Sequence, residues 1–285
     1  MKLAIVGFGL IGSSLARALR RAGPIAIQAI DTNSANRAHS AASSLADAQA
    51  SDIKDLWPDA DMICLATPVA AIIADLPRLA DRAAPHTVIF DVGSVKGPIA
   101  EAMTQARPDF TRFVPAHPMA GAHLSGPGAG SADLFQDRHV ILTPTPKTDP
   151  QATKAVGDLF ARCGAKVAEM SPEHHDEVVA YVSHVPHLLA FATMLTGETL
   201  APSLQGDQFA FASSGFASFT RIAASDPTIW VDILLQNREK IDATLALFTQ
   251  QADALRATMM AGDADTLKAR LTLARELRKA MESDR

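Results

Sequence analysis

Two polar side chains stand near the ends of two apolar, strand-like segments, where together they could move a proton. His117 lies in the sequence PAHPMAG, and Ser94 lies in DVGSVK. Imidazole titrates near neutral pH, so His117 can remove a proton from a substrate alcohol, and the Ser94 hydroxyl can orient that imidazole or the substrate oxygen. The alternative for His117 is a loop histidine bonded to backbone. Pro118 and Gly121 indicate a shaped loop and favour the catalytic interpretation.

A third candidate is a cation. Arg221 lies among apolar residues at helical spacing, and buried arginines are rare unless they are paired. A substrate carboxylate would be a good bidentate partner. The alternative is an ion pair within the chain, with Asp226 or Asp232. Asp226-Pro227 also has the form of a helix start, with the acid as its cap.

Two histidines occur together in the sequence SHVPH. Helical spacing places His184 and His187 on one face, in line with Glu177 and Ala180. Pro186 should kink the helix because it lacks an N–H. The spacing alone permits a metal site, but no matching cysteine or carboxylate cluster accompanies it in the sequence, so we expect no metal. One histidine, His184 in preference to His187, is expected to be simply packed.

The element that must position these groups begins at the N-terminus. An apolar run over 2–6 is followed by Gly7, Gly9 and Gly12 in the spacing Gly-x-Gly-x-x-Gly, and then by a helical pattern. Gly7 permits a tight turn, Gly9 lets the backbone approach a pyrophosphate, and Gly12 lets the helix lie close to the sheet. The pyrophosphate would cap the helix N-terminus. A turn that binds nothing and a signal peptide are the alternatives; the arginines that follow argue against the signal peptide.

Asp31 completes this motif. It follows the apolar run 25–30, nineteen residues after Gly12, where a carboxylate accepts hydrogen bonds from a ribose 2′-hydroxyl and repels a 2′-phosphate. Thr32 and Asn33 follow with no arginine beside them, so NAD is favoured over NADP. The cofactor-binding residues that we predict are Gly7, Gly9, Leu10, Ile11, Gly12, Asp31, Thr67 and Pro68.

The composition of the chain limits the remaining possibilities. A length of 285 residues favours two domains. The net charge of −5 gives no general attraction to nucleic acid or anionic membrane, and no apolar run is expected to reach transmembrane length. The two cysteines, Cys64 and Cys163, are expected to be reduced and packed. We therefore expect a cytoplasmic protein without nucleic-acid or membrane partners.

The pattern of elements changes along the chain. The first part alternates strands with helices, including helices at 9–21, 69–82 and 150–162, and this alternation indicates a parallel, doubly wound α/β sheet. The expected strands are 2–6, 25–30, 62–66, 87–91, 113–116, 139–143 and 166–169. At Ser171-Pro172-Glu173 a helix start appears, and helices are expected at 172–200, 206–224, 227–259 and 262–282. We predict a dinucleotide-binding domain at 1–170 and a helical domain at 171–285, with the active site in the cleft between them.

At this point the chain resembles the prephenate/arogenate dehydrogenase family. The matching stretches are GFGLIG, ATPV, DVGSVK, HPMAG, SHVPH and FTRIAASDPTIW, in that order, from residue 7 to residue 230. The resemblance implies a Rossmann-like domain followed by an all-helical dimerisation domain, a homodimer, and NAD-dependent oxidative decarboxylation of prephenate or arogenate on the route to tyrosine.

The resemblance also assigns roles to matching positions. His117 is similar to the catalytic histidine that takes the proton from the ring hydroxyl, and Ser94 to the serine that links that histidine to substrate and cofactor. Arg221 matches the residue that holds the ring carboxylate. His187, Ser183 and Trp230 fall where the family lines its substrate pocket.

One departure from the family bears on the substrate. Many relatives carry Thr and then an acid after HPMAG, where this chain has Ala122 and His123. The acid matches the ammonium group of arogenate, which prephenate lacks, and a protonated histidine would disfavour that group. We therefore expect prephenate to be preferred, with arogenate or dual-substrate activity as the alternative and His123 as a substrate-binding residue.

Two other functions are less well supported. A 3-hydroxyacid dehydrogenase would be expected to use a lysine in its helical domain, and residues 171–235 contain none. A non-catalytic NAD-sensing protein would not need Ser94, His117 and Arg221 together. We expect no regulatory or mutase domain, and therefore expect any inhibition by tyrosine to act at or near the active site.

Overall fold

The computed structural model describes residues 1–121, 125–207 and 209–283. It divides into two compact units, Met1–Arg238 and Glu239–Arg285. The second unit holds most of α10 (Arg238–Met260) and all of α11 (Ala264–Ser283). The predicted site residues that the structure describes all belong to the first unit. The division into domains at residue 170 remains a prediction.

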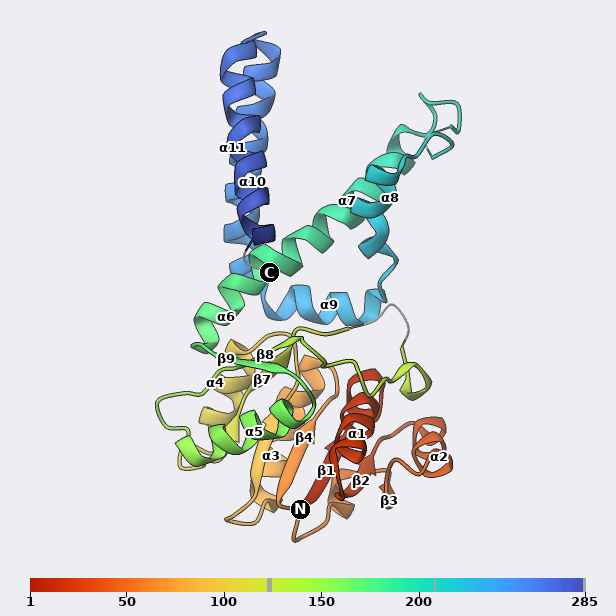
Figure 1. Cartoon of the computed structure of the whole chain (residues 1–285), viewed down its shortest axis with the longest axis vertical. Coiled ribbons are helices and arrows are strands. Elements are labelled where there is room, and N and C mark those ends of the chain that lie inside the picture. Colours follow the sequence, from red (N-terminus) through yellow and green to blue (C-terminus); the bar gives the residue numbers. More distant parts are fainter. Residues whose placement is uncertain (122–124, 208, 284–285) are drawn as a thin grey trace. The chain divides into compact units, whose positions relative to one another are not determined.

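A six-stranded parallel sheet forms the centre of the first unit (Figure 1). Its strands lie in the order β3-β2-β1-β4-β5-β6, so the order reverses between β1 and β4. Ligands of doubly wound sheets bind beyond the carboxyl ends of the strands at such a reversal. The strands are β1 (Lys2–Val6), β2 (Ala26–Ile30), β3 (Ala48–Ala50), β4 (Met62–Leu65), β5 (Val88–Asp91) and β6 (Phe113–Val114).

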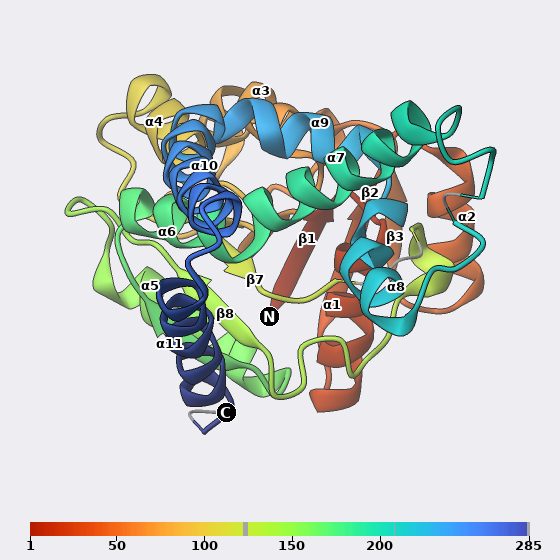
Figure 2. The same ribbon diagram turned by 90° about the horizontal axis from the view of Figure 1, so that it is seen from above.

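Helices cover both faces of this sheet because its strands are apolar on both sides. In β1, Leu3 and Ile5 pack with residues of α1 (Leu10–Ala22) and α5 (Pro150–Arg162). Ala4 and Val6 face the other way and pack with α3 (Val69–Arg82) and α4 (Gly97–Ala106). Figure 2 shows α3 and α4 on one side of β1 and α1 on the other. This arrangement fixes β1 and the Gly-rich turn that follows it.

The single parallel sheet expected from the sequence is wrong in one respect. The expected strand 113–116 is interrupted at Pro115, which cannot donate a ladder hydrogen bond, and the chain continues as β7 (Ala116–Pro118) in a second sheet. There β7 pairs antiparallel with β8 (His139–Leu142), which pairs parallel with β9 (Lys166–Glu169). His117 therefore lies on a strand of the small three-stranded sheet and not on the large parallel sheet.

Other elements were missed because their patterns are short or polar. Strand β3 has the sequence AQA, and α2 (Ser34–Ala42) is a polar helix capped by Asn33, whose side chain accepts a hydrogen bond from Ala35 N. Short 3₁₀ turns occur at η1 (Ile53–Asp55) and η2 (Pro127–Ala129). None of them alters the sheet order at the site.

The helix expected at 172–200 forms with a change of pitch. It consists of α6 (Pro172–Val179), a π-helical turn η3 (Ala180–His184) and α7 (Val185–Leu200). Pro186 has no N–H to donate, so the α-helical ladder cannot continue through it unchanged. Such π turns are frequent at functional sites, and this one contains Ser183 and His184.

The remaining helical predictions have wrong boundaries. The helix expected at 206–224 is shorter, with α8 (Ser214–Thr220) followed by the 3₁₀ turn η4 (Arg221–Ala224). The helix expected at 227–259 is divided into α9 (Pro227–Gln236) and α10 at Asn237, which is buried and has φ −109° and ψ 21°. The helix expected at 262–282 is α11.

The expectation that no apolar run reaches transmembrane length is also wrong. Within the described residues, the helix from Pro172 to Leu200 is long and apolar enough to cross a membrane by length and composition. Polar residues interrupt the apolar ones along this helix. Three of those polar residues, His175, Asp176 and His184, are buried in the first unit, while Tyr181 and Leu195 are exposed.

Candidate active site

The Gly-rich turn after β1 has the geometry that a bound pyrophosphate requires. Gly7 has φ +91°, and a Cβ there would lie 2.6 Å from the carbonyl oxygen of Ala66. A Cβ on Gly12 would overlap the carbonyl oxygen of Gly7, so α1 can approach the turn only with glycine at that position. Gly9 is the N-cap of α1, and a Cβ on it would meet no atom within 4 Å. The space before the helix N-terminus can therefore accept a dinucleotide phosphate.

Asp31 follows β2 and is held in place by three donors. Its Oδ2 accepts hydrogen bonds from Phe8 N at 2.8 Å and Asn36 Nδ2 at 3.0 Å, and its Oδ1 accepts one from Asn33 N at 2.8 Å. With Gly7, Gly9, Thr67 and Pro68, it lines a pocket of about 360 Å³. This is the position in which a carboxylate contacts the adenosine ribose of a dinucleotide.

The structure corrects the expectation that no arginine stands beside this carboxylate. Arg37 Nη1 donates to the backbone oxygens of Asp31, at 2.6 Å, and Thr32, at 2.9 Å. Residue 37 is six positions from residue 31 in the sequence, but the first turn of α2 brings the guanidinium back to the end of β2. The Asp31 carboxylate and the Arg37 guanidinium therefore both lie near the carboxyl end of β2.

A larger pocket, of about 910 Å³, gathers most of the predicted site residues. It lies within the first unit, beyond the ends of β1, β4, β5 and β7, and η3, α7, η4 and α9 form the rest of its wall. His123 lies outside the described residues. The predicted residues that line this pocket are Gly9, Leu10, Ile11, Thr67, Pro68, Ser94, His117, Ser183, His187, Arg221 and Trp230.

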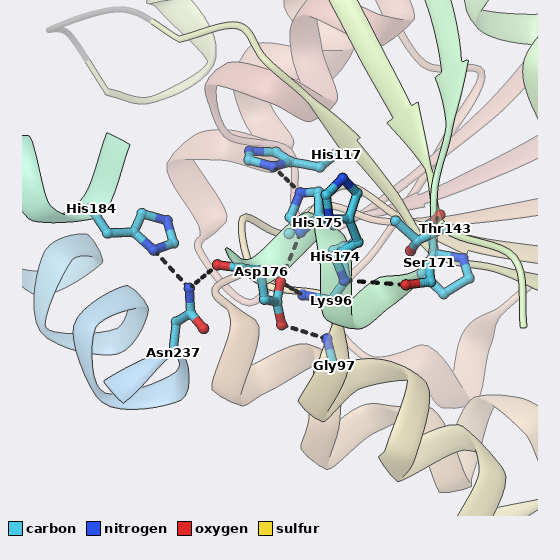
Figure 3. Close-up of polar contacts among 12 residues, drawn as sticks. Lys96, Gly97, His117, Thr143, Ser171, His174, His175, Asp176, His184 and Asn237 are labelled. Carbon is cyan, nitrogen blue, oxygen red and sulfur yellow. Dashed lines mark hydrogen bonds and ion pairs between the residues drawn. The ribbon is translucent and has the colours of Figure 1, made fainter. Parts of the chain in front are cut away.

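His117 is buried and forms part of a hydrogen-bonded series of side chains (Figure 3). Its Nδ1 lies 2.8 Å from Nε2 of His175, and Nδ1 of His175 lies 2.7 Å from Oδ1 of Asp176. Burial lowers the pKa of His117 well below the ordinary histidine value, and repulsion from Lys96 and from any proton on His175 or His184 acts in the same direction. The imidazole is therefore neutral at physiological pH and can accept a proton.

Sequence reasoning missed His175 and Asp176. They lie in PEHHDEVV, the first helix after residue 171, where a polar turn has the appearance of an exposed helix start. The sequence feature that could have revealed them is the spacing of the buried residues in α6. His175 and Asp176 lie on the same buried side of this helix as Val179. His174, next to them, is exposed.

A buried ion pair supports the backbone next to His117. The Nζ of Lys96 and a carboxylate oxygen of Asp91 are in contact, and both side chains are fully buried. Lys96 Nζ also donates to the carbonyl oxygen of Ala116 at 2.7 Å, and Asp91 accepts from Gly93 N at 2.8 Å. The pair therefore ties the DVGSVK segment, which carries Ser94, to β7.

His184 and His187 have different surroundings. His184 is buried, and its Nδ1 accepts a hydrogen bond from Asn237 Nδ2 at 3.1 Å. Burial lowers its pKa to about 4. His187 is half-buried, donates from Nδ1 to the carbonyl oxygen of Ser183 at 2.9 Å, and stacks on Trp230 with ring centroids 3.7 Å apart. The π turn before His187 frees that carbonyl for the contact.

The expectation that Arg221 is buried is wrong. Arg221 is exposed and begins η4, where it lines the wide pocket. The two acids considered as its partners have other contacts: Asp226 accepts from Thr228 N at 2.9 Å, as the cap of α9, and Asp232 accepts from Ala70 N at 3.1 Å. A guanidinium at an accessible pocket wall can meet a carboxylate that enters from solvent.

The arrangement offers a base, an anion-binding helix N-terminus and a guanidinium around one pocket. Across the described ranges of the chain, no group of three or more His, Cys, Asp or Glu side chains is placed to hold a metal ion. The chemistry that these groups can perform is proton removal from a substrate held by its carboxylate beside a dinucleotide.

Comparison with known proteins identifies the family. Residues 15–169 match the prephenate dehydrogenase nucleotide-binding domain, and residues 171–273 match the prephenate dehydrogenase dimerization domain. The cyclohexadienyl dehydrogenase of Zymomonas mobilis is 34% identical over 283 residues, which is 99% of this chain and 96% of that protein.

Two solved structures are similar over nearly the whole chain. The crystal structure of prephenate dehydrogenase from A. aeolicus, in complex with hydroxyphenyl propionate and NAD⁺, has a TM-score of 0.93 and 32% identity, covering 99% of this chain and 98% of that one. Synechocystis arogenate dehydrogenase has a TM-score of 0.83 and 28% identity, with coverage of 99% and 100%. This chain belongs to the prephenate dehydrogenase family.

Proposed function

We propose that this protein catalyses the NAD-dependent oxidative decarboxylation of prephenate to 4-hydroxyphenylpyruvate, a step in tyrosine biosynthesis. The observation that carries the proposal is the position of His117, a buried neutral imidazole in the wall of the pocket that also contains the Gly-rich turn and Arg221. Family membership supports the enzyme class and the nucleotide cofactor.

The residues present fit NAD. The open space at Gly9 and the free end of α1 would receive the pyrophosphate, and the Asp31 carboxylate would receive the ribose hydroxyls. When bound, NAD supplies the hydride acceptor. The structure related to this chain that was crystallised with NAD⁺ supports this assignment.

His117 would act twice in the reaction. It first removes the proton of the ring hydroxyl as hydride leaves the same ring carbon, which gives a ketone conjugated to the carbon that bears the carboxylate. Loss of carbon dioxide then sends its electron pair through the ring to that oxygen. The phenolate takes the proton back from His117, so hydride transfer and carbon dioxide release leave no net proton change. The aromatic product makes the reaction effectively irreversible.

The other residues would hold the substrate in place. Arg221 would pair with the ring carboxylate until it departs, and Ser94 would link His117 to the substrate oxygen. His187, Ser183 and Trp230 line the same pocket and would contact the rest of the ring and its side chain. Orientation of this kind supplies much of the rate of a reaction between two bound molecules.

A dual prephenate and arogenate activity is the second candidate. The observation that favours it is the presence of two carboxylates, Asp226 and Asp232, in the pocket wall, since arogenate carries an ammonium group where prephenate has a ketone. The similarity to a cyclohexadienyl dehydrogenase agrees with it. His123, the residue that argues for prephenate, lies outside the described residues.

One experiment separates these possibilities. Purified protein is given prephenate or arogenate, each with NAD or NADP, and reduced cofactor and carbon dioxide are both measured. We expect the largest kcat/KM with prephenate and NAD. A larger kcat/KM with arogenate would overturn the preference for prephenate, and no turnover with either substrate would overturn the proposed function.

We also propose that the protein is a cytoplasmic homodimer that associates through the helices of residues 171–285. The match of 171–273 to a dimerization domain supports this, as do apolar side chains exposed along α7, α10 and α11, such as Leu195, Leu247 and Leu277. Sedimentation equilibrium is expected to give twice the chain mass of 30.1 kDa; a monomer at micromolar concentration would contradict the proposal.

A further inference from the structure

We propose that His175 and Asp176 are positioning residues that hold His117 in the tautomer with its proton on Nδ1 and its lone pair on Nε2. The inference rests on the proposed function, in which His117 is the base. A neutral histidine has two tautomers, and only the one with a free Nε2 can take a proton there while Nδ1 stays bonded to His175. The hydrogen bonds behind His117 determine which tautomer is present.

The series begins at the carboxylate of Asp176, which only accepts. Its Oδ1 receives hydrogen bonds from Lys96 N at 2.8 Å and from His175 Nδ1 at 2.7 Å, and its Oδ2 receives one from Gly97 N at 2.8 Å (Figure 3). The two backbone groups can only donate. A Cβ on Gly97 would lie 3.0 Å from Oδ2, so glycine there lets the carboxylate approach.

Proton positions then follow from one atom to the next. Because Asp176 accepts, His175 carries its proton on Nδ1, and its Nε2 has a lone pair. His117 Nδ1 lies 2.8 Å from that lone pair and must donate to it. A neutral His117 that donates from Nδ1 has a free lone pair on Nε2, the nitrogen required as the base.

Burial and the surrounding groups favour the neutral form of both imidazoles, His117 and His175. Burial lowers the pKa of His117 most. Repulsion from a proton on His175, from Lys96 and from a proton on His184 also opposes its protonation. For His175, burial lowers the pKa most, Lys96 adds to this, and Asp176 and Asp91 oppose it. If His175 were protonated, both of its nitrogens would donate. His117 Nδ1 would then have to accept, and its proton would move to Nε2.

The hydrogen bond between His117 Nδ1 and His175 Nε2 can also form when His117 is protonated. Once Nε2 has taken the substrate proton, the imidazolium still donates from Nδ1 to His175. The His175 ring is polarised by Asp176, which lies behind it, so this hydrogen bond offsets part of the cost that burial imposes on the positive charge of His117. The pair would therefore affect the rate and its pH dependence more than it affects substrate binding.

Nitrogen-15 NMR of histidine-labelled protein tests the tautomers without any turnover. We expect the ring signals of both His117 and His175 to show a protonated Nδ1 and an unprotonated Nε2 at pH 7.5, with His117→Asn and His175→Gln variants assigning the signals. An Nε2-protonated His117 in the wild-type protein would overturn the inference even if the enzyme is active.

Three variants connect the tautomer with the rate. His175→Leu removes the acceptor for His117 Nδ1, whereas His175→Gln can keep an acceptor through its amide oxygen. His174→Gln is the matched control, because His174 is exposed on the same helix turn. We expect kcat of His175→Leu to fall about tenfold to a hundredfold, the loss that follows removal of the hydrogen-bond partner of a metal-bound histidine, with the KM for prephenate and the Kd for NAD unchanged within about twofold.

The remaining outcomes are equally specific. His175→Gln should recover most of kcat and retain the Nδ1 proton of His117, and its activity should persist to lower pH because the residue at 175 can no longer be protonated. Equal kcat values in His175→Leu and His174→Gln would overturn the inference, as would loss of activity in His175→Gln with a normal melting temperature. A wild-type protein without turnover but with the expected NMR tautomers would overturn only the proposed function.

Discussion

Nδ1 of His117 lies 2.8 Å from Nε2 of His175, and this contact joins residues 58 positions apart in the chain. His117 comes from β7 in the small sheet, whereas His175 comes from the first turns of α6. Asp176 in turn accepts hydrogen bonds from the backbone N–H groups of Lys96 and Gly97, at the start of α4. Three separate segments therefore converge on one imidazole, and its orientation depends on how they pack.

Replacement of the candidate base tests the centre of the proposal. His117→Asn is expected to lower kcat with prephenate by a factor of about 10²–10⁴, the range that general-base catalysis usually contributes, while NAD binds with unchanged Kd. His139→Asn, an exposed histidine on the neighbouring strand β8, is the control and should behave as wild type. Full activity in His117→Asn would refute the assignment of the base.

Local sequence patterns were sufficient to predict the Gly-rich turn after β1 and the acid that follows β2. Glycine spacing, an apolar strand and an acid at the end of the next strand act over about thirty residues, and backbone geometry links them directly, as Gly7, Gly12 and Asp31 show. The parallel sheet around them follows from alternating strand and helix patterns. Its strand order, and the separate sheet that begins after Pro115, depend on tertiary pairing that periodicity does not encode.

The residues of the proposed catalytic centre were predicted only one by one. Spacing identified His117 but not His175 and Asp176, because a polar turn in a helix gives no sign of which partner it meets across the fold. Arg221 was expected to be buried from its apolar neighbours, yet the break of the helix into η4 turns it to an open wall. Contacts between distant segments decide these positions, and single-sequence patterns are silent about them.

The buried neutral His184 makes stability depend on pH. Its pKa is about 4 in the folded protein and about 6.5 when unfolded, so the unfolded chain binds more protons between these values. The free energy of unfolding is therefore complete above pH 6.5 and falls as the pH drops toward 4. The loss from this group is about 3 kcal/mol at most.

Urea unfolding at pH 7 and pH 4.5 measures this effect. His184→Gln can still accept from Asn237 but cannot be protonated, so the difference in unfolding free energy between the two pH values should shrink. His86→Gln, an exposed histidine, should leave the difference as in wild type. An unchanged pH dependence in His184→Gln would show that His184 is not the group responsible.

The proposed contact of Arg221 with the ring carboxylate can be tested by comparing its effect on the use of prephenate with its effect on the binding of the product. Arg221→Ala is expected to lower kcat/KM for prephenate about tenfold or more, because hydrogen bonds to charged groups contribute about 1.5–3 kcal/mol. The ring carboxylate leaves as carbon dioxide, so the inhibition constant of 4-hydroxyphenylpyruvate should change little. A large increase in that constant would mean that Arg221 holds the side-chain carboxylate instead.

Two glycines of the same turn should respond differently to alanine. A Cβ on Gly9 meets no atom within 4 Å, so Gly9→Ala should fold with a normal melting temperature but bind NAD more weakly, because the methyl group occupies the space for the pyrophosphate. A Cβ on Gly12 overlaps the backbone of Gly7, so Gly12→Ala should lower the melting temperature as well. Equal melting temperatures for the two variants, with equal NAD affinity, would contradict these roles.

The choice between NAD and NADP depends on two opposite charges at the end of β2. Asp31 would repel a 2′-phosphate, whereas Arg37, bonded to the backbone oxygens of Asp31 and Thr32, would attract it. Asp31→Ser should therefore lower kcat/KM with NAD and raise it with NADP. Their ratio should shift by about tenfold or more, because a tenfold shift corresponds to about 1.4 kcal/mol and a like-charge contact costs at least that much.

The source of that shift is tested in the double variant. Adding Arg37→Ala to Asp31→Ser should abolish the gain with NADP, because no cation then remains to meet the 2′-phosphate, while activity with NAD stays at the level of the single variant. Asp55→Ser, an exposed acid beyond β3, controls for the change in net charge and should leave the ratio unaltered. A gain with NADP that survives the loss of Arg37 would place the recognition of the 2′-phosphate on another group.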